Sequence, residues 1–166
     1  TNEPRFHCLP SGPGAYPAGA TAGGQRRIVQ HPDFIAILNH EMTYRQVYMD
    51  GRKLEDEPVL STWMGYSTGH WEGDTLVIDT IGLRNDTWID WNGSVLTEAA
   101  KVREEIRRPD FGHLEIKVTV DDPKAYTKPW SVTLKQRIVV DTDLIDEICL
   151  ENEKFETFVD RTRKRP

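Results

Sequence analysis

Apolar and polar residues alternate along most of the chain with a period of two. The clearest case is Leu114–Val120, in which every second residue is apolar and the residues between them are polar or charged. This period predicts strands, because successive side chains of a strand point to opposite faces. The predicted strands are Arg26–Gln30, Phe34–Glu41, Thr43–Met49, Trp63–Trp71, Thr75–Thr80, Lys101–Arg108, Leu114–Val120, Val132–Val140 and Leu144–Leu150.

Tight turns separate most of these strands. Asp50-Gly51-Arg52, Glu72-Gly73-Asp74 and Asp141-Thr142-Asp143 each combine residues that favour reversals of the chain. Leu96–Ala100 is the one stretch in this region that favours a short helix. Closely spaced strands without long helices predict an all-β antiparallel meander, which usually closes into a barrel or folds into a sandwich. An up-and-down β-barrel of about 8–10 strands is favoured, because closure removes exposed edges. A barrel of this size can hold one small ligand.

The length of 166 residues fits one domain with flanking segments. Residues 1–24 are rich in proline and glycine and are interpreted as an arm laid over the domain, with a flexible linker as the alternative. Residues 25–153 form the predicted barrel. Residues 154–166 form a charged tail.

Charge and motifs narrow the function. The chain has 27 acidic and 21 basic residues, a net charge of −6, which disfavours nucleic acid as a partner. No apolar run is long enough for a membrane span. The spacings typical of zinc, nucleotide-phosphate and dinucleotide sites are missing from the sequence, so no metal or other cofactor is expected.

Polar residues on otherwise apolar strand faces are the first candidates for a site. His40, Asp79 and Glu104 would form an acid/base set if they met inside the barrel, with His40 as the base. Gln136 would contact a ligand from the predicted strand Val132–Val140. The alternative is an internal ion pair or hydrogen-bond network, with Arg45 or Arg107 as the cation.

The hairpin Trp63–Thr80 adds further candidates. Tyr66 and His70 lie on its first arm and would donate hydrogen bonds to a developing oxyanion. Aromatic residues suited to flat apolar ligands or sugars accompany them, although ordinary packing explains such residues equally well. These aromatic ligand-binding candidates are Tyr44, Tyr48, Trp63, Trp88 and Trp91.

Several long motifs resemble a widespread group of exported bacterial proteins of uncharacterised activity. The similarity covers most of the chain. The motifs that carry it are Cys8-Leu9-Pro10, Tyr44–Arg52, Trp63–Ser67, Trp71–Thr80, Asp122–Trp130 and Cys149–Asn152. Because the group has no established activity, the resemblance supplies no catalytic residues.

The resemblance implies a secreted or periplasmic protein with a Cys8–Cys149 disulfide and a barrel similar to lipocalins and other calycins. The residues alone leave two buried thiols as an equal possibility. The chain departs from the group at three places: Tyr66 replaces a histidine, His70 replaces an arginine, and Val95–Glu98 replaces a Pro-His-Ser-Glu string. These departures imply a different ligand or a relocated acid/base group.

Two functions from different classes follow. The first is a cofactor-independent lyase, isomerase or hydrolase that uses acid/base chemistry on a small molecule inside the barrel. The alternative is a lipocalin-like binding protein for a small hydrophobic or sugar-like ligand, without catalysis. A third interpretation is a partner-binding module with Trp88 and Trp91 as an exposed patch. The sequence is also compatible with a homodimer.

Overall fold

A computed structural model describes residues 9–13, 25–54, 60–90 and 93–145, and in these ranges the protein is all-β. No helix within them is long and apolar enough to cross a membrane. The strands are β1 (Arg26–Gln30), β2 (Phe34–Asn39), β3 (Tyr44–Tyr48), β4 (Tyr66–Glu72), β5 (Thr75–Ile81), β6 (Thr87–Trp88), β7 (Val95–Leu96), β8 (Lys101–Asp110), β9 (His113–Asp121) and β10 (Trp130–Arg137).

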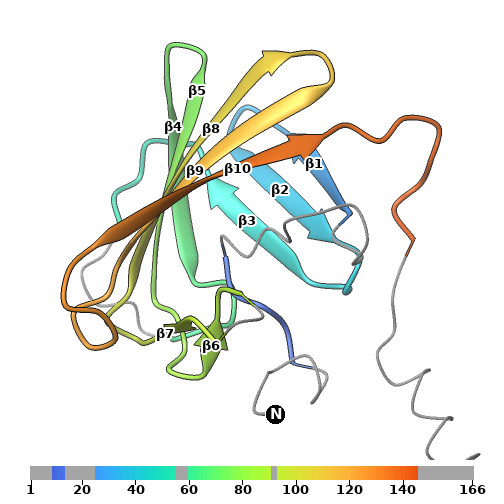
Figure 1. The fold of residues 1–166 in the computed structure, drawn as a ribbon. Helices are drawn as coiled ribbons and strands as arrows, with labels where there is room; N and C mark the ends of the chain where they lie inside the picture. The colour runs from blue at the N-terminus through green and yellow to red at the C-terminus, as the bar shows by residue number, and fades with distance from the viewer. Residues whose placement is uncertain (1–8, 14–24, 55–59, 91–92, 146–166) are drawn as a thin grey trace, which may run out of the picture.

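One strongly curled sheet dominates the structure (Figure 1). It has eight strands in the order β1-β2-β3-β4-β5-β8-β9-β10. Every neighbouring pair is antiparallel except β3 and β4, which run parallel over Val47↔Ser67 and Tyr48↔Thr68. The predicted antiparallel meander is therefore wrong at this junction. A parallel pair needs a long connection, and the chain between Tyr48 and Tyr66 is long enough to provide one.

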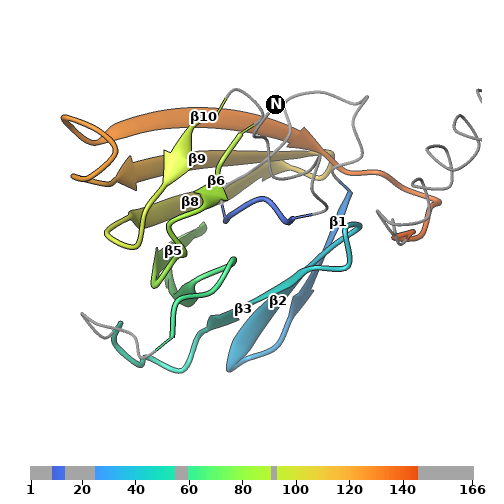
Figure 2. The same ribbon diagram turned by 90° about the horizontal axis from the view of Figure 1, so that it is seen from below.

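The described strands form a half-barrel and do not close (Figure 2). Within the described residues, β1 and β10 each pair with one neighbour only. The segment after β10 reaches the other edge, where the Asp143 carboxylate lies 3.1 Å from the Arg27 guanidinium on β1. The first arm of the predicted final hairpin is shorter than expected, because β10 stops at Arg137. Most of the second arm, residues 146–150, lies outside the described ranges.

The hydrophobic core lines the inner face of the curl. On β2 the buried residues are Ile35 and Ile37, so Phe34, Ala36 and Leu38 lie on the outer face. The reason is register: Ile35 pairs with Val47, which is fully buried on β3. The core also contains Leu76, Ile78, Leu83, Ile89, Leu96, Ala100, Val102, Ile106, Ile116, Val118 and Val120.

The β6–β7 hairpin fills one end of the curl. Leu96 is fully buried and pairs with Thr87, and Ala100 donates its N–H to the Thr97 carbonyl in a turn, so the predicted helix over Leu96–Ala100 is wrong. The buried Asp122 carboxylate holds this turn by accepting bonds from the Thr97 N–H (2.7 Å) and hydroxyl (2.8 Å). Gly12, from the N-terminal segment inside the curl (Figure 2), donates its N–H to the Trp88 carbonyl at 2.9 Å.

Gly65, at the entry to β4, offers a stability test. Its φ is +65°, and a Cβ there would lie 2.6 Å from the Ile81 carbonyl oxygen and 2.7 Å from Thr80 Cγ2. Gly73 has a similar φ of +62° but has open space around the same position. We expect Gly65→Ala to lower the free energy of unfolding by about 3 kcal/mol and Gly73→Ala by about 1 kcal/mol. Urea denaturation measures both, and equal losses would contradict the packing argument.

Candidate functional site

A buried polar cluster occupies the centre of the inner face. Arg45 on β3 and Glu104 on β8 form an ion pair of 2.5 Å, and their side chains are 4% and 0% exposed. Arg45 Nε donates to the Ser67 hydroxyl at 3.0 Å, and Nη2 donates to the Thr80 hydroxyl at 2.6 Å. The cluster therefore joins β3, β4, β5 and β8, which agrees with the predicted internal ion pair between Glu104 and Arg45.

Strand alternation separates Asp79 from this cluster. Glu104 pairs in register with Ile78 and shares the inner face with it, so the next residue, Asp79, points outward. The proposed set of His40, Asp79 and Glu104 therefore does not come together. His40 is buried in the turn after β2, where its backbone N–H donates to the Gln25 carbonyl at 3.2 Å.

His70 and Asp79 belong to an ion-pair network on the outer face. His70 Nε2 lies 2.9 Å from Glu72, and Arg103 reaches Asp79 at 3.3 Å and Glu72 at 3.5 Å. Arg107 bonds Asp74 at 3.0 Å, and its hydrogen bond lowers the pKa of that carboxyl. Such exposed pairs contribute little energy and are typical of a solvated sheet surface.

Tyrosines occupy the outer face of β3 and the start of β4, beside the charged residues farther along β4. Tyr44, Gln46 and Tyr48 alternate with the buried Arg45 and Val47, so they share the outer face. The rings of Tyr48 and Tyr66 lie 5.3 Å apart at an angle of 35°. Tyr44 is 69% exposed at the other end of β3. We call Tyr44, Gln46, Tyr48, Tyr66 and the neighbouring Arg52 the tyrosine face.

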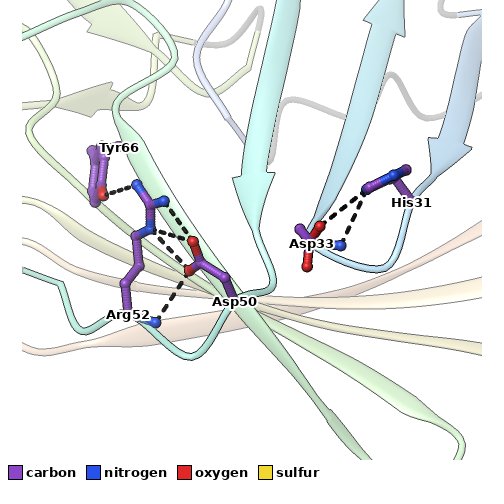
Figure 3. A network of polar contacts seen from close by, with 5 residues as sticks. All are labelled: His31, Asp33, Asp50, Arg52 and Tyr66. Atoms are coloured by element: carbon purple, nitrogen blue, oxygen red, sulfur yellow. Dashed lines mark hydrogen bonds and ion pairs between the residues drawn. The ribbon is translucent and has the colours of Figure 1, made fainter.

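Arg52 covers part of the tyrosine face. Its guanidinium lies 3.7 Å from the centre of the Tyr48 ring, and Nη1 donates to the Tyr66 hydroxyl at 3.2 Å. Asp50 accepts from Nε at 2.9 Å and from Nη2 at 2.5 Å (Figure 3). The hydrogen bond from Arg52 lowers the pKa of Asp50. Figure 3 also shows His31 and Asp33 on the neighbouring turn before β2.

The remaining aromatic candidates are dispersed. Trp63 packs under the Arg84 guanidinium at 4.4 Å, and Arg84 in turn bonds Asp86. Trp88 is half-buried on β6, within the hairpin that fills the curl. Gln136 is half-buried near the end of β10, and Trp91 lies outside the described residues, as do Cys8 and Cys149. The described structure brings Tyr44, Tyr48 and Tyr66 onto one surface and does not bring Trp88 or Gln136 there.

Sequence reasoning missed Asp50 and Arg52 as site residues, since it treated Asp50-Gly51-Arg52 only as a turn. The available signal was the spacing of four residues that separates Tyr44, Tyr48 and Arg52, the last of them in the turn after the strand. In the described ranges, no three His, Cys, Asp or Glu side chains are arranged to hold a metal ion.

Comparison with known proteins gives no relative from which to transfer a function: no family model, no curated protein and no solved structure matches the chain.

The ion pair between Arg45 and Glu104 predicts that removing one of the two charges lowers the free energy of unfolding more than removing both. Glu104→Ala leaves a guanidinium in the core without its counter-charge, so we expect a loss of about 3–5 kcal/mol in the free energy of unfolding. The double variant Arg45→Met/Glu104→Leu removes both charges and should lose clearly less. Chemical denaturation of the double variant and of the single variants Arg45→Met and Glu104→Leu completes a double-mutant cycle. A double variant as unstable as the sum of the single ones would show that the pair is not coupled.

Proposed function

We propose that this protein is a binding protein for a sugar-like ligand, without acid/base catalysis, and that the ligand lies on the tyrosine face. The observation that carries the proposal is the row of Tyr44, Gln46 and Tyr48 along the outer face of β3, in which Tyr44 and Gln46 are exposed and Tyr48 is half-buried. Tyr44 is 69% exposed and pairs with Leu38 on the outer face of β2, so the core does not explain its aromatic ring.

The chemistry of this row suits a saccharide. Aromatic rings offer flat apolar surfaces to the C–H faces of sugar rings, and tyrosine hydroxyls add polar contacts at little cost in conformational entropy. Gln46 lies between the tyrosines and offers both a donor and an acceptor to sugar hydroxyls. Tyr44 and Tyr48 are four residues apart, about 13 Å along a strand, a length that a short oligosaccharide covers.

The inner cluster supports binding over catalysis. Glu104 is fully buried and paired with Arg45, and Asp79 faces the opposite side of the sheet. A cofactor-independent enzyme needs two titratable groups that face one reacting atom. Asp79 and Glu104 do not meet this condition. The exported location that the resemblance implies would place the tyrosine face where extracellular saccharides are found.

Substitution of Tyr44 tests the proposal. We expect Tyr44→Ala to weaken oligosaccharide binding about fivefold to tenfold, because the ring contributes stacking area and no core packing. Calorimetric titration with neutral and acidic trisaccharides measures the change.

Phe111→Ala is the matched control. Phe111 is 73% exposed, but it lies in the turn between β8 and β9, away from the tyrosine face. Equal affinities for the Tyr44→Ala and Phe111→Ala variants, or no binding by the native protein at millimolar saccharide, would overturn the proposed function.

A further inference from the structure

The contacts of Arg52 point to the class of saccharide. Its guanidinium is stacked on Tyr48 (3.7 Å) and held at Nη1 by the Tyr66 hydroxyl (3.2 Å). Two aromatic side chains from β3 and β4 therefore fix the plane of the group at the surface. A fixed guanidinium plane binds a carboxylate through two parallel hydrogen bonds more readily than a mobile one.

Asp50 already shows this mode of binding. Its two carboxylate oxygens accept bonds from Nε and Nη2 of Arg52 (Figure 3). The side chains of Asp50 and Arg52 are 34% and 42% exposed, so water and solutes reach the pair. Exposed ion pairs contribute little net stability, because water solvates the separated charges well. A carboxylate from a ligand can therefore compete with Asp50 for the same two donors.

From these contacts we propose that the tyrosine face recognises an acidic saccharide, with a uronic acid carboxylate taking the place of Asp50 on Arg52. The inference rests on the proposed function and adds the charge of the ligand to it. One sugar ring lies on Tyr44, Gln46 bonds hydroxyl groups along the strand, and the carboxylate meets Arg52 beside Tyr48.

The charge of the whole chain limits the length and the charge of the ligand. A net charge of −6 repels a long polyanion, whereas the attraction between Arg52 and one carboxylate acts at contact distance. The fitting ligand is therefore a short oligomer or a chain end rather than the middle of a densely charged polymer.

The experiment compares two probes with the same sugar rings: the trimer of galacturonic acid, and its full methyl ester, in which every carboxylate charge is removed. Calorimetric titration gives the affinity of each for the native protein and for three variants. We expect the native protein to bind the acid about tenfold more tightly than the ester, as one charge-assisted bidentate contact implies.

Two substitutions separate the roles of the ion pair. Arg52→Gln should abolish the preference for the acid, because both probes then meet an uncharged side chain at this position. Asp50→Asn should tighten binding of the acid several-fold, because it removes the competing carboxylate. Asparagine keeps an oxygen that can accept the backbone N–H of Arg52, which bonds Asp50 at 3.2 Å, so the turn is preserved.

Arg108→Gln is the matched control. Arg108 also lies over an aromatic ring, that of Phe111 at 5.1 Å, but it lies at the β8–β9 turn and bonds backbone carbonyls. This variant should bind both probes as the native protein does.

The failures of the two proposals can be told apart. Binding of neither probe overturns the proposed function together with this inference. Equal binding of both probes, or a preference for the acid that survives in Arg52→Gln, overturns the inference and leaves a sugar-binding face standing. Weaker binding of the acid by Asp50→Asn would show that Asp50 supports the ligand instead of competing with it. That result would also overturn the inference that a ligand carboxylate takes the place of Asp50 on Arg52.

Discussion

The ion pair between Arg45 and Glu104 is the interaction on which the arrangement of the sheet depends. Two charges in a core carry a large desolvation cost, which only close pairing and further hydrogen bonds offset. Here the Ser67 and Thr80 hydroxyls complete the surroundings of Arg45 at 3.0 and 2.6 Å. A shift of one residue in β3 or β8 would turn one partner to the outer face, so the pair selects a single register.

This selection matters most between β3 and β4. Their parallel pairing spans only Val47↔Ser67 and Tyr48↔Thr68, a short contact for a junction in the middle of the sheet. Arg45 bridges it from the inside, because its side chain reaches β4, β5 and β8 together. On the outside, the contact between Tyr48 and Tyr66 spans the same junction. The candidate binding surface and the buried cluster therefore lie on opposite faces of the same β3–β4 junction.

The outer surface of the sheet has two chemical characters as a result. Over β5, β8 and β9 it carries paired charges, such as Arg103 with Asp79 and Lys117 with Glu105. Over β3 and the start of β4 it carries tyrosines, and Arg52, from the segment after β3, is stacked on Tyr48. The proposed function assigns this difference to ligand binding on the tyrosine face.

The sequence by itself determined the strands of the large sheet, because alternation records which residues of a strand share a face. It did not predict the short strands β6 and β7. It also predicted that Glu104 points inward and that Arg45 could be its partner. The tertiary structure alone decided that Asp79 and Glu104 lie on opposite faces, since β5 is apolar at Leu76, Val77 and Ile78 and shows no alternation there. It alone decided that β3 and β4 run parallel and that Tyr48, Arg52 and Tyr66 meet, because pairing between strands depends on contacts distant in sequence.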